Sequence, residues 1–268
     1  MDDDTFPTLG LGTWKNTDPD GCAESVATAL DVGYRHVDTA QAYDNEEYVG
    51  EGIRRSSVDR EDVFLATKVS SGNLAYEDVL ESTEKSLDRL GVERVDLLYV
   101  HWPTNTYVAE ETLPAFDELR DEGKIRHVGV SNFEPAQLEE ANDFLDAPIF
   151  ANQVEMHPLC QQEELVEYAR DDGHWLVAYS PLARGSVFDV EEVVEVAEKH
   201  DVTPAQVCIA WLLQKDRVAA IPKSASDEHI VENWEAQRLD LDPRDVEKID
   251  SINRTEREVD SAQAPWNW

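Results

Sequence analysis

The chain of 268 residues carries 58 acidic and 23 basic side chains, so its formal net charge at pH 7 is −35. A surface of that sign is repelled by nucleic acid and by anionic membranes, and we expect neither as a partner. No run of about 18 apolar residues occurs, so no membrane span is predicted, and the N-terminus lacks the basic and apolar regions of a signal peptide.

Glycine and proline, 12 of each, are spread evenly and form no linker, which predicts a single domain over residues 1–268. The three cysteines, Cys22, Cys160 and Cys208, are odd in number and have no metal-ligand spacing. We therefore expect free thiols, no bound metal and a cytoplasmic location, where thiols stay reduced.

The acidic residues are dispersed along the chain and do not gather in a tail. Such a surface is typical of proteins from salt-loving organisms. Self-repulsion destabilises the fold in dilute buffer, where the Debye length is long. The sequence therefore predicts a halophilic protein that is adapted to molar salt.

Strand and helix patterns alternate along the chain. The predicted strands cover residues 9–13, 34–38, 63–68, 95–100, 125–130, 148–154, 175–181 and 218–221. The predicted helices cover 20–32, 45–55 with Asn45 as N-cap, 76–90, 110–122, a segment from 135, 162–170, and 190–214 with a break before Pro204. Eight strands separated mostly by helices favour an α/β fold, the (β/α)8 TIM barrel. A doubly wound sheet is the alternative, but no GxGxxG follows the first strand.

In such a barrel all strands end at one rim, and that rim carries the chemistry. The predicted strand ends supply Asp38 with Tyr43 beyond it, Lys68, His101, Ser131 and Asn132, Gln153, Tyr179 and Ser180, and Lys223 and Ser224. Each residue alone has an ordinary structural explanation, such as a buried carboxylate that accepts backbone N–H groups. Together, four titratable types around one cavity indicate an active site.

The pKa of a free tyrosine, about 10, is too high for an efficient proton donor near neutrality. We expect the ammonium group of Lys68 to lower the pKa of Tyr43, while Asp38 holds that ammonium charged and in place. His101 can donate to a substrate carbonyl oxygen. This set suits delivery of a proton to an oxygen that becomes negative as its carbon receives a hydride.

The sequence resembles the aldo-keto reductase family over nearly its whole length. The matching segments, in family order, are GLGTW (10–14), DTAQAYDNEEYVGEGIR (38–54), ATK (66–68), HWP (101–103), GVSNF (129–133), NQVEMHP (152–158), AYSPL (178–182), AQVCIAWLLQ (205–214) and IPKS (221–224). The spacing of the Asp–Tyr–Lys–His set is similar to that of the family's short microbial branch, which includes diketogluconate reductases.

The resemblance implies a monomeric barrel that binds NADP(H), with use of NAD(H) left open, and that reduces aldehydes or ketones to alcohols. It makes Tyr43 the general acid, Asp38 and Lys68 its tuning partners, and His101 the carbonyl-orienting group. The implied cofactor contacts are Gly12, Thr13 and Trp14 in the first motif, Ser131, Asn132 and Gln153 on the nicotinamide carboxamide, Tyr179 on its ring, Ser180 and Leu182 along the pyrophosphate, Lys223, Ser224 and His229 at the 2′-phosphate, and Glu232 and Asn233 at the adenine.

Three features differ from the family pattern. The N-terminal hairpin that plugs the bottom of the barrel is shortened to a few residues before Leu9. The loops after His101 and Leu182 are short, which predicts an abbreviated clamp over the cofactor. Where the family has arginine after IPKS, this chain has His229, which predicts a weakened preference for NADPH over NADH.

Aromatic walls for a small carbonyl substrate are predicted from Trp14 and Trp102. Trp266 and Trp268 are expected to lie in a loose tail. Two rival functions remain open. A cofactor-binding redox-sensing or regulatory subunit would not need the complete donor set, and a metal-dependent sugar isomerase or hydrolase would need a carboxylate cluster at the strand ends.

Overall fold

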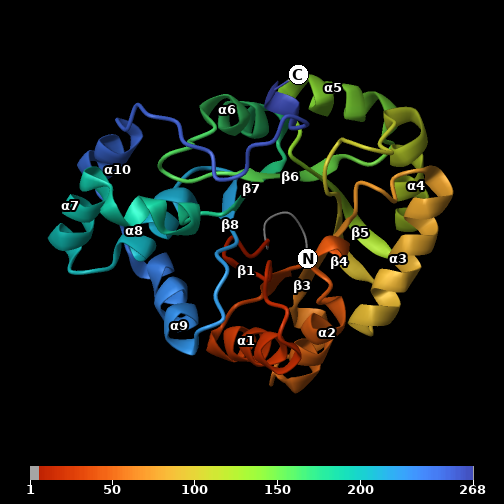
Figure 1. Ribbon diagram of the computed structural model, residues 1–268, viewed down its shortest axis with the longest axis horizontal. Coiled ribbons are helices and arrows are strands. Elements are labelled where there is room, and N and C mark those ends of the chain that lie inside the picture. The colour runs from red at the N-terminus through yellow and green to blue at the C-terminus, as the bar shows by residue number, and fades with distance from the viewer. Residues whose placement is uncertain (1–5, 268) are drawn as a thin grey trace.

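The computed structural model describes residues 6–267 and confirms the predicted TIM barrel (Figure 1). The strands are β1 (Gly10–Gly12), β2 (His36–Asp38), β3 (Phe64–Val69), β4 (Val95–Val100), β5 (Ile125–Ser131), β6 (Ile149–Glu155), β7 (Trp175–Tyr179) and β8 (Val218–Ala220). Neighbouring strands pair in parallel in chain order. Isolated bridges between Leu9 and Ala220 and between Gly12 and Lys223 join the last strand to the first.

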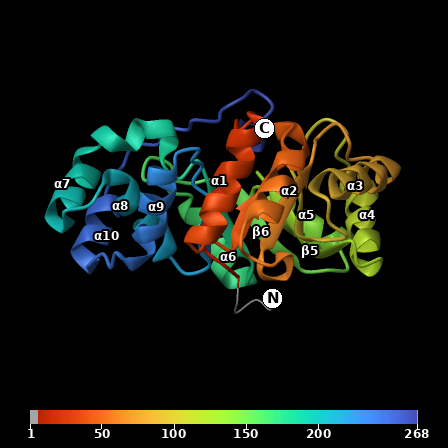
Figure 2. The same ribbon diagram turned by 90° about the horizontal axis from the view of Figure 1, so that it is seen from below.

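Helices surround this barrel on all sides (Figures 1 and 2). They are α1 (Pro19–Val32), α2 (Glu46–Arg55), α3 (Tyr76–Leu90), α4 (Ala109–Asp121), α5 (Pro135–Phe144), α6 (Glu163–Asp172), α7 (Glu191–His200), α8 (Pro204–Leu213), α9 (Asp227–Glu235) and α10 (Pro243–Asp250). The predicted break before Pro204 separates α7 from α8. The sequence pattern did not predict α9 or α10. Within residues 6–267, no helix has the length and apolar character that crossing a membrane requires.

Strands β1, β2, β7 and β8 are shorter than predicted, and in β2 and β7 the reason is that turns use the outer residues. Tyr34 does not start β2, because its N–H bonds to the Ala29 carbonyl at 3.0 Å and closes the end of α1. Gly33 permits this turn with a φ of 134°. At the other site, Ser180 has a φ of 49° and turns the chain out of β7 directly after Tyr179.

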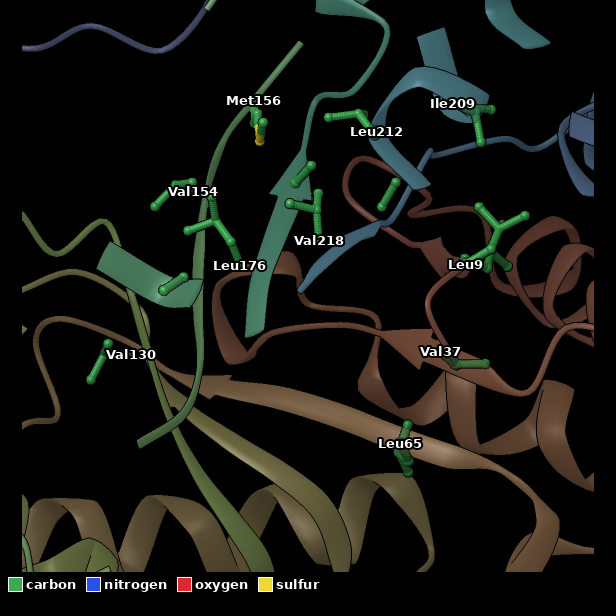
Figure 3. Close-up of a cluster of buried hydrophobic side chains, with 14 of the residues drawn as sticks. Leu9, Val37, Leu65, Val130, Val154, Met156, Leu176, Ile209, Leu212 and Val218 are labelled. Atoms are coloured by element: carbon green, nitrogen blue, oxygen red, sulfur yellow. The ribbon is translucent and has the colours of Figure 1, made fainter. Parts of the chain in front are cut away.

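The alternation of side chains along each strand divides the core into two parts. Outward residues such as Val37 and Leu65 pack against the helices (Figure 3). Inward residues such as Phe64, Ala66 and Tyr99 fill the barrel. Gly129 belongs to this interior, since a Cβ there would lie 2.6 Å from the Tyr99 ring.

At the bottom of the barrel the Phe6 ring packs among aromatic rings from the strands. Phe6 is buried, and its ring centroid lies 4.8 Å from that of Phe64, 5.1 Å from Trp175 and 5.2 Å from Phe150. His36 also lies in this group, 5.2 Å from Phe6. We call Phe6, His36, Phe64, Phe150 and Trp175 the aromatic plug.

Candidate active site

The four predicted catalytic residues lie close together because they follow or end neighbouring strands at the same rim of the barrel. Inward positions alternate, so Phe64 and Ala66 in β3 are followed by Lys68. In β4 the same alternation leads from Tyr99 to His101, just beyond the strand. Asp38 ends β2. Because parallel strands share one rim, these side chains converge over the barrel interior.

A buried ion pair lies at the centre of the site. The Lys68 ammonium donates to Asp38 Oδ1 and, at 2.8 Å, to the carbonyl of Thr39, and both charged side chains are at most 2% exposed. Gln153 Nε2 donates to Asp38 Oδ2 at 2.8 Å. Burial lowers the pKa of Lys68, while the Asp38 charge opposes this shift. The hydrogen bonds fix the geometry of both charges.

Tyr43 and His101 lie above this pair and face the same cavity. The Tyr43 hydroxyl is 3.5 Å from Lys68 Nζ, and its ring centroid is 5.8 Å from that of His101. Burial, followed by the charge of Lys68, lowers the pKa of His101 to about 3, so this imidazole is neutral above acid pH. A neutral imidazole carries one N–H to donate.

The prediction that Lys68 lowers the pKa of Tyr43 is wrong. Burial raises the pKa of Tyr43 well above its usual value, and the Asp38 charge raises it further. The ammonium of Lys68 is hydrogen-bonded to Asp38 and lies at the limit of hydrogen-bond distance from the phenol of Tyr43. Tyr43 is therefore protonated at neutral pH.

A cavity of about 550 Å³ opens above these residues. Predicted residues that line it are Asp38, Tyr43, His101, Gly12, Thr13, Trp14, Trp102, Ser131, Asn132, Gln153, Tyr179, Ser180, Leu182 and Lys223. Lys68 lies behind the cavity, fully buried. Ser224, His229, Glu232 and Asn233 do not line it; they lie on the loop after β8 and on α9.

The predicted amide-binding residues form a network with one another. Ser131 Oγ donates to the Gln153 carbonyl at 2.8 Å, and Asn132 Nδ2 donates to Ser131 Oγ at 3.0 Å and to the His101 carbonyl at 3.1 Å. The Tyr179 hydroxyl donates to Asn132 Oδ1 at 2.9 Å. Asn132 has a φ of 64°, a conformation that asparagine tolerates better than most residues. The network fixes this wall of the cavity.

The predicted phosphate end lies where β8 leads into α9. Lys223 is exposed and Ser224 is buried, with Ser224 Oγ accepting the N–H of Ser226 at 3.1 Å. His229 is exposed in the first turn of α9, together with Asp227 and Glu228. The two acids offset part of the attraction that a helix N-terminus has for an anion.

Asn45 does not cap α2 with its side chain, although it occupies the N-cap position. Its Nδ2 instead donates to the carbonyls of Thr13 at 2.8 Å and Asn16 at 3.1 Å, and its Oδ1 accepts from Thr39 Oγ1 at 2.8 Å. The buried amide thus ties the loop after β1, which carries Trp14, to the loop after β2.

Sequence reasoning missed several residues that line the cavity, namely Ala42, Pro181, Arg184, Gly185, Phe188, Ile221 and Val259. Arg184 lies in η4, the 3₁₀ segment Ala183–Asp189, with its guanidinium 4.8 Å from the Trp14 ring centroid. Lys15 Nζ lies 4.3 Å from the same centroid. A signal existed for Arg184, since a base that follows the SPL motif is conspicuous in so acidic a chain.

The expectation that Trp266 belongs to a loose tail is wrong. Its ring centroid lies 5.7 Å from that of Trp102, and Arg257 stacks on it at 4.1 Å. Val259, in the same C-terminal segment, lines the cavity. The prediction for Trp268 lies outside the described residues.

Comparison with known proteins agrees with the fold and identifies the family. The model of the Aldo/keto reductase family matches residues 8–254. The glyoxal reductase of Bacillus subtilis (strain 168) is 41% identical over 94% of this chain and 91% of its own length. The methylglyoxal reductase DkgB of Escherichia coli O157:H7 is 38% identical over 95% of this chain and 96% of its own.

A solved structure assigned as a 2,5-diketo-D-gluconic acid reductase B superposes with a TM-score of 0.93 at 37% identity, covering 97% of this chain and 92% of that one. The fold, the motifs and the full-length similarity agree, and the chain belongs to the aldo-keto reductase family, whose members reduce carbonyl compounds.

Proposed function

We propose that the protein reduces small aldehydes, 2-oxoaldehydes of the glyoxal and methylglyoxal type among them, with NADPH as the preferred hydride donor and NADH as a weaker one. The observation that carries this proposal is the arrangement of Tyr43 and His101 over the buried Lys68–Asp38 pair at the floor of the cavity. Relatives that cover almost the whole chain are named for glyoxal and methylglyoxal reduction.

The residues of the cavity fit a nicotinamide cofactor. Its lining extends from Tyr43 and His101 past Ser180 and Leu182 to Lys223 at the end of β8. Although the chain as a whole is acidic, this lining carries two basic side chains, Arg184 and Lys223. A ligand with phosphate groups requires such bases. When bound, the nicotinamide supplies the hydride that the carbonyl carbon receives.

In the proposed reaction Tyr43 supplies the proton that converts the carbonyl oxygen to a hydroxyl. Because burial raises the pKa of Tyr43, the phenol remains protonated and is ready to donate. An alkoxide is more basic than a phenolate, so the proton transfer is favourable once negative charge develops on oxygen. His101 orients the carbonyl through its single N–H, and Lys68 stabilises the phenolate that remains.

Trp14, Trp102 and Val259 provide apolar walls for the organic part of a small substrate. We propose that the enzyme works in the cytoplasm, where its buried thiols stay reduced. The non-catalytic reading is not favoured, because Tyr43 and His101 face the cavity over the buried Lys68–Asp38 pair.

NADPH oxidation decides this proposal. A preparation treated with chelator should oxidise NADPH with glyoxal, methylglyoxal and glyceraldehyde, and each product should be the corresponding alcohol. Failure with all three aldehydes would contradict the proposal, and loss of turnover on chelation would favour the metal-dependent alternative.

A further inference from the structure

Glu155, at the end of β6, is a buried carboxylate that the reaction does not use. It lies two positions beyond Gln153 on the same face of the strand, and its side chain is fully buried. Unlike Gln153, it makes no hydrogen bond to the Asp38 pair. The cost of burying a carboxylate must be offset by hydrogen-bond donors. The donors therefore identify the segment that the carboxylate holds in place.

Two of its three donors belong to the backbone of the C-terminal segment. Glu155 Oε1 accepts the N–H of Glu258 at 2.5 Å, and Oε2 accepts the N–H of Val259 at 2.9 Å. The third donor is His157 Nε2 at 2.9 Å. The carboxylate thus binds two consecutive peptide groups of a segment that begins about 100 residues later in the chain.

The segment held in this way, residues 257–266, contributes Val259 to the lining of the cavity, which Tyr43 and Trp102 also line. Arg257 stacks on Trp266, which packs on Trp102. In Figures 1 and 2 the chain after α10 crosses the barrel end where β6 and β7 finish. Glu155 holds this segment to the barrel through a buried charge.

We propose that Glu155 is a positioning residue that holds residues 257–266 as the wall of the carbonyl pocket and thereby sets the affinity for the substrate. This inference rests on the proposed function of the cavity. Glu155 touches neither the reacting atoms nor the residues at the phosphate end. Its loss should therefore weaken substrate binding without altering cofactor binding.

Four variants test the role of this carboxylate. Glu155→Gln replaces one acceptor oxygen by an N–H₂ group that faces a tail N–H. Glu155→Asp keeps the charge but is one methylene shorter. Glu258→Pro removes one donor from the C-terminal segment and leaves the residues of the barrel unchanged. Glu258→Ala is its matched control, because it keeps the N–H and removes only the side chain, which accepts from Ser186 at 2.8 Å.

Loss of one hydrogen bond to a charged group should raise the KM for methylglyoxal about tenfold in Glu155→Gln and Glu258→Pro. We expect kcat and the Kd of NADPH to change by no more than about threefold in these variants, since the donor set is untouched. Glu155→Asp should be intermediate, and Glu258→Ala should keep the wild-type KM.

Wild-type KM in both Glu155→Gln and Glu258→Pro would overturn the inference, as would a fall in kcat at unchanged KM. If Glu155→Gln fails to fold, the Glu258 pair decides alone. Amide exchange of residues 255–267 is a second readout that does not depend on turnover, and it should accelerate in Glu258→Pro but not in Glu258→Ala. It separates a failure of this inference from an inactive wild-type enzyme, and unchanged exchange in Glu258→Pro would also contradict it.

Discussion

Tyr43 combines two properties that favour a proton donor. Its hydroxyl faces the cavity, and burial raises its pKa, so it is protonated before any substrate arrives. The role expected for Lys68 therefore changes. In place of lowering the pKa in the resting protein, the ammonium is available to stabilise the phenolate after the proton has left.

Replacing this phenol gives the first prediction. Tyr43→Phe removes the donor and keeps the ring, so kcat for methylglyoxal should fall by about 10²–10⁴-fold while the Kd of NADPH stays within about threefold of wild type. Steady-state kinetics and cofactor fluorescence measure the two quantities. Near-full turnover at saturating cofactor would show that another group donates the proton.

The second prediction concerns His229 and the choice of cofactor. A histidine offers one or two hydrogen-bond donors to a phosphate group, whereas arginine is always charged and can bind phosphate in a bidentate manner. Replacing His229 by arginine should therefore strengthen the preference for NADPH over NADH.

In His229→Arg the ratio of kcat/KM for NADPH over NADH should be about tenfold higher than in the wild type. His229→Ala is the matched control and should not show this gain. A ratio that His229→Arg leaves unchanged would contradict the assignment of His229 to the 2′-phosphate.

Among the elements, the loop after β1 depends on one amide. Asn45 satisfies the carbonyls of Thr13 and Asn16, which lie between β1 and α1 beside Trp14. Asn45→Ala should cost about 2–4 kcal/mol of unfolding free energy, because it leaves buried polar groups without partners. Denaturant unfolding measures this loss.

Ser56→Ala is a suitable comparison for Asn45→Ala, since Ser56 bonds at the other end of α2 to a local carbonyl, that of Ile53, at 2.8 Å. It should cost less than about 1 kcal/mol. Equal losses for the two variants would mean that the amide has no special role in the loop.

The aromatic plug makes the fold sensitive to acid. Burial lowers the pKa of His36 to about 4, against about 6.5 for a free histidine. As the pH falls, the unfolded chain takes up this proton first. The contribution of the neutral His36 to the free energy of unfolding is therefore complete above pH 6.5 and is lost as the pH falls towards 4. At pH 4.5 the loss is roughly 2 kcal/mol.

His36→Leu removes this titration and should make the decline in stability between pH 7 and pH 4.5 shallower by that amount. Denaturant titrations at both pH values give the slope, and His229→Leu, at an exposed position, should leave it as in wild type. An unchanged slope in His36→Leu would show that other groups cause the acid sensitivity.

The elements also explain which parts of the site could be predicted from the sequence. Asp38, Lys68, His101 and Gln153 follow from strand alternation and a shared rim, which local pattern determines. Arg184 and Val259 reach the cavity from η4 and the C-terminal segment. Their positions depend on long-range contacts, such as that between Glu155 and Glu258. Such contacts produce no periodic pattern in the sequence.

At the scale of the whole molecule, acids outnumber their partners. Lys199 bonds to Asp242 at 2.6 Å and to Asp245 at 2.7 Å, and Lys124 pairs with both Glu84 and Glu122. A base shared between two carboxylates leaves net negative charge on the surface. This observation supports the proposal of adaptation to high salt, because salt screens the remaining repulsion.

Salt should therefore stabilise the protein. Raising KCl from 0.1 M to 2 M shortens the Debye length from about 10 Å to 3 Å or less and should raise Tm by about 10 °C or more. An equivalent series with sucrose, which favours burial without screening charge, should raise Tm less. Full stability and activity at low salt would refute the adaptation.

The bridges that join β8 to β1 have a consequence for how the protein is made. Closure of the barrel requires Ala220 to reach Thr8 and Leu9, so it waits until nearly the whole chain has left the ribosome. At translation rates of about 5–20 residues per second, this interval lasts on the order of ten seconds. During that time the free edges of β1 and β7 can pair with strands of other nascent chains. We infer that the dense negative charge, which strains the finished fold, keeps neighbouring nascent chains apart until each barrel has closed.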